Sequence, residues 1–162
     1  MIASFLPFQP NKGQKELLDK LAVFMLNPAV DKPLFLLRGY AGTGKTSVVA
    51  ALVKTLRQLD RQVVLLAPTG RAAKVLASHA GENAHTIHKQ IYRQARLGEE
   101  SFGIATNNFQ HTLFIVDEAS MISNQREYSQ FGTGCLLDDL LQYIYSGTDC
   151  LAVFVGDDAQ LP

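Results

Sequence analysis

The feature that most constrains this chain is a glycine-rich octapeptide, Gly39-Tyr40-Ala41-Gly42-Thr43-Gly44-Lys45-Thr46. It follows the apolar run Leu34–Leu37 and precedes a stretch, from Lys45 to about Leu59, whose apolar residues recur at helical spacing. The octapeptide fits G-x-x-x-x-G-K-[ST], a loop whose backbone N–H groups converge on phosphate oxygens at a helix N-terminus. The sequence therefore predicts a strand, a phosphate-binding loop and a helix, in that order.

Apolar runs alternate with helical patterns along the chain, which is typical of an α/β fold with a parallel sheet. Four runs predict strands: Leu34–Leu37, Val63–Ala67, Leu113–Val116 and Leu151–Val155. Helices are expected in four stretches: after the cap residue Asn11, over 45–59, over 71–78, and from Leu136 to Ile144. Because each strand run is apolar on both faces, we expect helices on both faces of a mainly parallel sheet.

The segments that follow the four predicted strands are polar or glycine-rich. They are 39–46, 68–71, 117–120 and 156–160. Ligands of open α/β sheets bind beyond the carboxyl ends of the strands. The sequence therefore predicts one shared site that all four segments line.

A magnesium triphosphate fits this predicted site. Lys45 would lie between the β- and γ-phosphates, and the Thr46 hydroxyl would bind Mg²⁺. Asp117, which ends an apolar strand, would hold Mg²⁺ through water. Glu118 would orient and deprotonate the attacking water, and the Gln160 amide would sense the γ-phosphate. The expected catalytic set is thus Lys45, Asp117, Glu118 and Gln160.

Composition excludes several other classes of protein. The chain has 162 residues, 47% hydrophobic, which suggests one globular domain. Its two cysteines have no zinc-ligand spacing, and a zinc site from His79, His85 and His88 is disfavoured. No run is long enough to span a membrane and the start is no signal peptide, so a soluble cytoplasmic protein is expected.

The formal net charge of zero conceals an asymmetry. Residues 1–96 hold 14 of the 15 Lys and Arg residues but only five acids. Within 70–96 the bases are Arg71, Lys74, Lys89, Arg93 and Arg96. Such a segment can follow a phosphate backbone, with the Thr69 and Thr86 hydroxyls adding hydrogen bonds. An ordinary solvated basic face is the alternative.

Five motifs resemble those of superfamily 1 helicases of the B branch, the RecD-like and Dda-like group. Gly39–Thr46 resembles motif I, and Ala67-Pro68-Thr69-Gly70-Arg71-Ala72-Ala73 resembles motif Ia. His85-Thr86-Ile87-His88 is similar to the next, DNA-contacting segment. Asp117-Glu118-Ala119-Ser120 resembles motif II, and Gly156-Asp157-Asp158-Ala159-Gln160-Leu161-Pro162 resembles motif III.

The resemblance implies a RecA-like P-loop NTPase domain that spans residues 1–162, the N-terminal motor domain of an ATP-dependent 5′→3′ DNA helicase. ATP and Mg²⁺ would be bound by Gln14, Gly39, Gly42, Thr43, Gly44, Lys45 and Thr46, with Asp117 as a second metal ligand. Gln14, in a segment similar to the Q motif, would read adenine, with Phe8 near the base. Single-stranded DNA would contact Pro68, Thr69, Arg71, Thr86 and His88.

The resemblance also implies parts that lie outside this domain. A second RecA-like domain of the same polypeptide would supply arginines for the transition state, so the fragment alone is expected to be nearly inactive. Residues 97–111 are expected to hold a strand-separating β-hairpin pin, with Phe102 or Ile104 as an apolar wedge, although an ordinary loop explains the pattern equally well. Nuclease or recombination subunits are further expected partners, in DNA repair or recombination.

Two other functions remain open from the residues alone. One is a P-loop ATPase that acts on a substrate other than DNA. The other is a non-catalytic nucleotide-binding module, against which Lys45, Thr46, Asp117 and Glu118 argue, because a switch needs no water-activating acid.

Overall fold

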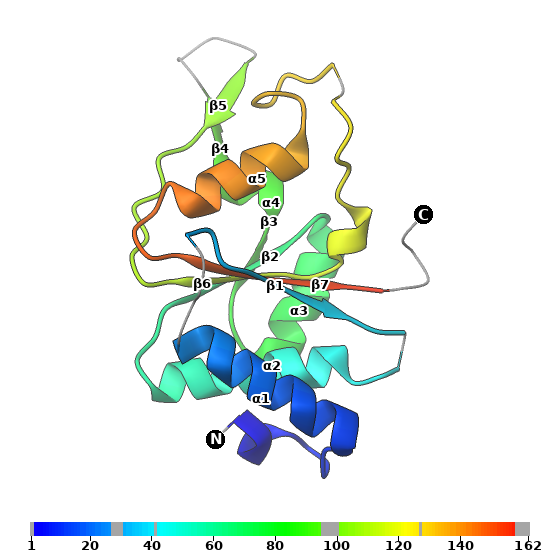
Figure 1. Cartoon of the computed structure of the whole chain (residues 1–162). Helices are drawn as coiled ribbons and strands as arrows, with labels where there is room; N and C mark the ends of the chain where they lie inside the picture. The colour runs from blue at the N-terminus through cyan, green and yellow to red at the C-terminus, as the bar shows by residue number, and fades with distance from the viewer. Residues whose placement is uncertain (1, 27–30, 41, 95–100, 127, 158–162) are drawn as a thin grey trace.

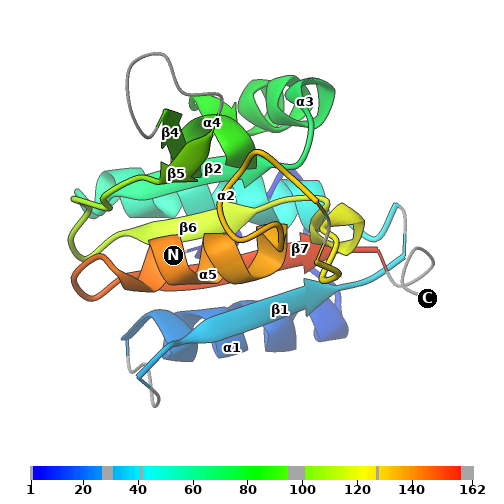
Figure 2. The ribbon, with the colours of Figure 1, turned by 90° about the horizontal axis from the view of Figure 1, so that it is seen from above.

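A computed structural model describes residues 2–26, 31–40, 42–94, 101–126 and 128–157 of the chain. Its centre is a five-stranded sheet in the order β1-β7-β6-β2-β3, in which all neighbouring strands are parallel (Figure 2). The strands are β1 (Leu34–Arg38), β2 (Val63–Ala67), β3 (Ala84–Thr86), β6 (Leu113–Val116) and β7 (Leu151–Gly156). All four apolar runs of the sequence are therefore strands of one sheet, and the predicted parallel α/β fold is confirmed.

Helices cover both faces of this sheet, as predicted (Figure 1). One face packs against α1 (Lys12–Leu26), α2 (Lys45–Gln58) and α3 (Gly70–Ala80), and the other against α4 (Ile87–Ile91) and α5 (Leu136–Tyr145). Alternate residues of the three inner strands, β2, β6 and β7, enter the two cores: Leu113 and Ile115 of β6 join the first, whereas Phe114 and Val116 join the second. This alternation is the two-residue period of a strand buried on both faces.

Strand β1 departs from the expectation that both of its faces are covered. Leu36 is 58% exposed and Leu34 is 39% exposed, although Leu37 is buried. The reason is that β1 is an edge strand. Helix α1 covers one of its faces, where the rings of Phe24 and Phe35 lie 5.4 Å apart, while the second core, under α4 and α5, includes no residue of β1.

Two further strands lie outside the main sheet and were not predicted with these bounds. β4 (Tyr92–Gln94) and β5 (Phe102–Ile104) form an antiparallel pair. β5 falls within the expected hairpin region 97–111, but β4 precedes that region, and residues 97–100 lie outside the described residues. Phe102 and Ile104, the expected wedge, are half-buried against the second core.

Two short 3₁₀ helices complete the described chain, η1 (Ile2–Phe5) and η2 (Ala119–Met121). Among the described helices, none combines the length and the apolar character that crossing a bilayer requires.

Candidate nucleotide-binding site

The glycine-rich loop joins the end of β1 to the start of α2, as predicted. Gly42 and Gly44 have φ angles of 78° and 89°, in the left-handed region that favours glycine. A Cβ atom on Gly44 would lie 3.2 Å from Gln14 Nε2 and 3.4 Å from Phe8 Cζ. Gly44 therefore serves two needs, an unusual backbone angle and close packing against the N-terminal segment.

Two side chains of the loop donate hydrogen bonds to backbone carbonyl groups of the same loop. Lys45 Nζ donates hydrogen bonds to the carbonyl oxygens of Gly39 and Tyr40, the latter at 2.9 Å. The Thr43 hydroxyl donates to the Tyr40 carbonyl at 2.8 Å. These contacts close the loop into a compact turn directly before α2.

A cavity of about 460 Å³ lies where this loop meets the ends of β6 and β7. Its walls are Gly42, Gly44, Lys45, Thr46, Ser47, Asp117, Glu118, Gly156 and Asp157. The structure thus brings together residues from three of the four predicted segments. Gln160, the fourth member of the expected catalytic set, lies outside the described residues.

The two acidic residues of this cavity have raised pKa values. Burial raises the pKa of Asp117, against the opposing effects of the Glu118 backbone N–H and the Lys45 charge. Burial also raises the pKa of Glu118, the neighbouring Asp117 carboxylate raises it further, and Lys45 opposes both effects. Lys45 lines the same cavity as both carboxylates, and its positive charge acts to lower the pKa of each.

Glu118 has a backbone conformation that is unusual for its residue type. Its φ angle is 52°, in the left-handed region, and it precedes η2. The Asp117 carboxylate accepts a hydrogen bond from the Glu118 N–H at 2.9 Å. Non-glycine residues in this region carry strain of about 1–3 kcal/mol and often occur at functional sites. The sequence contains no signal for this angle.

Gln14 binds both the phosphate loop and the start of α1. Its Oε1 accepts from the Asn11 N–H at 3.0 Å, while the Asn11 side chain accepts from the Gln14 N–H at 2.9 Å. This reciprocal pair is a capping box. Gln14 Nε2 donates to the Thr43 carbonyl at 3.2 Å. In this conformation both ends of the amide are engaged within the chain, and the reading of adenine by Gln14 stays a prediction.

The expected DNA contacts lie at or shortly after the carboxyl ends of the neighbouring strands β2 and β3. Ala67 and Thr86 are paired in the sheet, so the segments that follow them leave the same edge. Thr69 and Thr86 each cap a helix, accepting at 3.2 Å from the N–H of Ala72 and Lys89 respectively. A capping hydroxyl accepts with its oxygen and keeps its O–H able to donate, for example to a phosphate.

The other three expected DNA contacts differ in their surroundings. Arg71 is exposed on the first turn of α3, and Pro68 is half-buried before it. The His88 ring packs against Tyr92 and Phe131, with ring centroids 5.6 and 5.2 Å apart. Burial lowers the pKa of His88, which favours the neutral imidazole. A role of these residues in DNA binding stays a prediction.

Sequence reasoning gave no role to two residues that line the cavity, Ser47 and Asp157. Ser47 directly follows the loop motif, and Asp157 lies within the Gly-Asp segment after β7. Asp157 raises the pKa of Glu118. Ser47 adjoins the phosphate loop, and Asp157 lies in the segment 156–160 that was expected to line the site, but neither residue type at that position indicated a role by itself.

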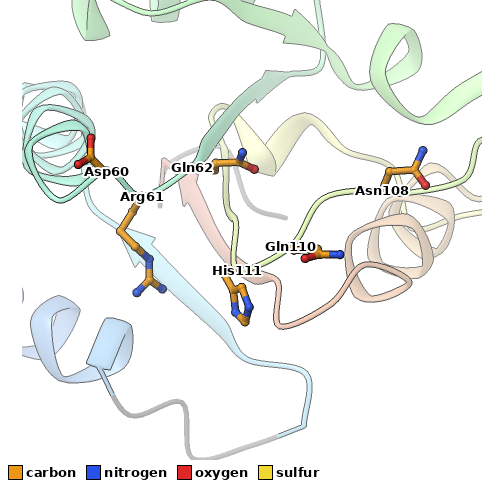
Figure 3. A pocket seen from close by; sticks show the side chains of 6 residues that line it. All are labelled: Asp60, Arg61, Gln62, Asn108, Gln110 and His111. Atoms are coloured by element: carbon orange, nitrogen blue, oxygen red, sulfur yellow. The ribbon is translucent and has the colours of Figure 1, made fainter.

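A second open cavity, of about 420 Å³, lies at the opposite end of the strands (Figure 3). It is lined by Asp60, Arg61, Gln62, Asn108, Gln110 and His111. Gln62 and His111 shortly precede β2 and β6, so this cavity is remote from the loops at the carboxyl ends. In the described part of the chain, no group of three His, Cys, Asp or Glu residues is placed to hold a metal ion.

The phosphate loop before α2 and the acidic pair after β6 define a P-loop nucleotide-binding domain of the RecA-like type. Residues 9–162 match the family model described as "AAA domain". The chain belongs to this family, within which it is a motor domain of the RecD-like superfamily 1 helicase type.

One curated relative is a DNA helicase by name, and another is a subunit of the RecBCD enzyme. The chain is 32% identical over 156 residues to the ATP-dependent RecD2 DNA helicase of Deinococcus radiodurans, covering 94% of this chain and 19% of that protein. It is 31% identical over 137 residues to the RecBCD enzyme subunit RecD of Haemophilus influenzae, covering 70% of this chain and 21% of that subunit. The chain therefore spans about a fifth of the length of each relative.

A solved structure supports the fold independently. The Pif1 helicase from Candida albicans superposes with a TM-score of 0.56 at 20% identity, covering 93% of this chain and 33% of that one. At that identity the likeness shows the fold, and it confirms the predicted RecA-like architecture.

Proposed function

We propose that this chain is the ATP-binding motor domain of a 5′→3′ DNA helicase that couples ATP hydrolysis to movement along single-stranded DNA. The observation that carries the proposal is the cavity in which Lys45 and Thr46 face Asp117 and Glu118. The similarity to the RecD2 helicase and to the RecD subunit supports DNA as the polymer on which the motor acts.

Triphosphate binding follows from the loop. The left-handed turns at Gly42 and Gly44 allow backbone N–H groups to converge at the N-terminus of α2, where the helix dipole also favours anions. Lys45 would exchange the carbonyls of Gly39 and Tyr40, to which it now donates, for phosphate oxygens. Gln14 and Phe8, which pack against Gly44, would keep the loop in place during this exchange.

Hydrolysis needs a base and a metal. Thr46 and Asp117 present hydroxyl and carboxylate oxygens to one cavity, and such oxygen donors fit Mg²⁺. When bound, Mg²⁺ supplies positive charge to the phosphate oxygens. Glu118 would accept the proton of the attacking water, and its raised pKa makes the carboxylate a stronger base than an exposed glutamate.

The remaining parts of the helicase are proposals of the same kind. DNA would pass over Thr69, Arg71 and Thr86, and the β4–β5 hairpin would serve as the pin that separates strands. A second RecA-like domain of the same polypeptide would supply arginines, and nuclease or recombination subunits would act beside it. A cytoplasmic location is part of the same proposal.

The experiment compares ATP hydrolysis with and without single-stranded DNA in a polypeptide that joins this domain to the proposed second RecA-like domain. Two variants of the cavity, Lys45→Ala and Glu118→Gln, are matched with Lys54→Ala, which removes an exposed lysine from the same helix, α2. Glu118→Gln should retain nucleotide binding and lose hydrolysis by about 10²–10⁴-fold. Lys45→Ala should lose binding, and Lys54→Ala should behave as the wild type.

An ATP hydrolysis rate that single-stranded DNA does not change would refute the proposal that the motor acts on DNA, and it would favour another substrate. Hydrolysis that survives Glu118→Gln would show that another group is the base. A strand-displacement assay on duplexes with a 5′ or a 3′ single-stranded overhang tests the direction of movement. Only the duplex with the 5′ overhang should be unwound.

A further inference from the structure

Four aromatic rings from separate parts of the chain form one cluster beside α4. His88 lies in α4, and Tyr92 directly follows that helix. Phe102 lies in β5, and Phe131 lies in the loop before α5. All of these segments are on the face of the sheet that α5 covers (Figure 1). The Phe131 ring contacts the other three, with its centroid 4.8 Å from that of Phe102 and 5.2 Å from those of Tyr92 and His88. We call these four residues the aromatic cluster.

The aromatic cluster is only partly covered by the rest of the protein. Tyr92 is buried, Phe102 and Phe131 are half-buried, and His88 is exposed. Single exposed apolar side chains are ordinary on protein surfaces, whereas contiguous groups of them mark binding surfaces. The cluster thus has a buried base at Tyr92 and an outer part, at His88 and Phe131, that solvent reaches.

Hydrogen bonds to a buried carboxylate hold the base of the cluster. The Tyr92 hydroxyl donates to Asp139 at 2.6 Å, and Asp139 also accepts from the hydroxyl and the N–H of Thr133, at 2.7 and 3.0 Å. Asp139 is fully buried on α5, and a buried carboxylate is tolerated only when hydrogen bonds replace its water shell. Tyr92 is therefore fixed to α5, and Thr133, two residues after Phe131, is fixed to the same carboxylate.

Backbone hydrogen bonds fix Phe131 against β5. The Phe102 N–H donates to the Gln130 carbonyl, and the Gly132 N–H donates to the Phe102 carbonyl, both at 2.8 Å. These two bonds form a parallel bridge between Phe102 and Phe131. Because the rings are already held in place, a ligand that stacks on them has little conformational freedom to remove.

Basic side chains flank the aromatic cluster. Lys89 directly follows His88, and Arg93 directly follows Tyr92; both basic residues are exposed. The Arg93 guanidinium donates to the carbonyls of Lys89 and Tyr92, both at 2.7 Å, which keeps its positive charge at the end of α4. Residues 83–94 contain no Asp or Glu. Aromatic rings beside positive charges suit a ligand that combines flat bases with phosphates, as single-stranded nucleic acids do.

The cluster also adjoins the proposed path of the DNA. α4 starts at Ile87, directly after Thr86, whose oxygen caps the helix and whose hydroxyl can donate to a phosphate. His88, the exposed ring, follows two residues later. Burial lowers the pKa of His88, which favours the neutral imidazole. The outer part of the cluster is therefore an uncharged aromatic surface next to a proposed phosphate contact.

We propose that the aromatic cluster is a stacking site for a nucleobase of single-stranded DNA, with His88 and Phe131 as the rings that the base contacts. This inference rests on the proposed function, because it assumes that the polymer is DNA. Lys89 and Arg93 bind the neighbouring phosphates, and Tyr92 is a positioning residue that supports the two outer rings. Every base has a π face, so stacking of this kind accepts any sequence.

Equilibrium binding of two labelled oligonucleotides to this chain tests the site. One is oligothymidylate, and the other is an abasic strand of the same length, which has the same phosphates and no bases. Phe131→Leu keeps an apolar side chain and removes the ring. This variant should bind oligothymidylate about 5-fold to 100-fold more weakly, which corresponds to the loss of one stacked base, and should bind the abasic strand as the wild type does. Phe131→Tyr, which keeps a ring, should retain the wild-type affinity for both strands.

Two control variants separate base stacking from a general effect on the fold and from phosphate binding. Phe109→Leu removes a half-buried ring outside the cluster, whose centroid lies 5.6 Å from that of Phe114, and should leave both affinities unchanged. Lys89→Ala should weaken binding of both strands equally and make it less dependent on salt. Should Phe131→Leu fail to fold, His88→Ala, which removes the exposed ring, decides the outcome by the same comparison of the two strands.

Two results overturn the inference while the proposed function stands. The first is that Phe131→Leu loses equal affinity for both strands, or none for either, because a stacking ring acts only on the strand with bases. The second is that the wild type binds the two strands equally, because no base is then contacted. Failure of the wild type to bind either strand at low salt would refute DNA as the polymer, and the inference with it.

Discussion

Gly132 offers the sharpest test of how the interior around Asp139 is packed. Its φ angle is 50°, and a Cβ would lie 2.8 Å from Tyr92 Cε1 and from Asp139 Cγ, distances that real Cβ atoms do not reach. Gly132→Ala must therefore strain the backbone. It must also push the buried Asp139 carboxylate away from its donors, which are the Tyr92 hydroxyl and the hydroxyl and N–H of Thr133. Left-handed strain costs about 1–2 kcal/mol and overpacking about 1–3 kcal/mol. We expect a loss of about 2–5 kcal/mol in the free energy of unfolding.

Two other glycines separate these contributions. Gly81 has a φ angle of 69° with no atom within 4 Å of a built Cβ, so Gly81→Ala isolates backbone strain, at about 1–2 kcal/mol. Gly103 lies in β5 with open space around a Cβ and no left-handed angle. Gly103→Ala should be neutral or stabilise the chain by up to about 1 kcal/mol, because alanine restricts the unfolded state.

Urea unfolding at 25 °C, followed by far-UV circular dichroism, measures all three variants on the same scale. The expected order of stability is Gly103→Ala, then Gly81→Ala, then Gly132→Ala. If Gly132→Ala matched Gly81→Ala within about 0.5 kcal/mol, the close contact with Asp139 would contribute nothing and the reasoning would be refuted.

Three further predictions concern the half-buried acidic pair, Asp117 and Glu118, and the buried Asn107. Asp117→Asn should stabilise the chain at pH 7 in urea unfolding, because a folded-state pKa raised mainly by burial means that the charged form destabilises the fold; the gain should vanish at pH values below the unfolded pKa. As the solution is acidified, the ATPase rate of the polypeptide with both domains should begin to fall at a higher pH than it would with an ordinary glutamate as the base. The reason is that the pKa of Glu118 is raised and only its ionised form accepts a proton. An ATPase rate that stays constant through the acid range would exclude Glu118 as the base. Asn107→Ala should lower the free energy of unfolding by about 2–4 kcal/mol, because the buried Asn107 amide donates to the carbonyls of Tyr143 and Ile144 and accepts from the Phe109 N–H; a loss below about 1 kcal/mol in the same urea assay would contradict this.

The features that the sequence predicted correctly depend on short-range patterns along the chain. The runs 63–67 and 113–116 are strands with the predicted bounds, because short apolar runs must be buried on both faces. The phosphate loop follows from glycine geometry and from its place between a strand and a helix. The convergence of Lys45, Thr46, Asp117 and Glu118 on one cavity follows from strand order in a parallel sheet.

The elements that the sequence did not predict depend on distant partners. β3 has only three residues, Ala84–Thr86. These residues form a strand because they pair with β2, and their composition alone does not indicate one. The hairpin strands β4 and β5 are equally short and flank residues 95–100. Exposure of Leu36 depends on the position of β1 at the sheet edge. Non-local pairing of this kind has no signal in a local pattern.

The sequence by itself determined four strands of the main sheet, four of the helices, the phosphate loop and the residue types at its mouth, because each depends on neighbours within a few positions. Tertiary structure alone decided which polar groups pair in the interior. Asp139 meets Tyr92 across 47 residues, and Gln14 meets Thr43 across 29. Whether a carboxylate on a helix faces water or three donors depends on what folds against it, and no periodicity within the helix carries that information.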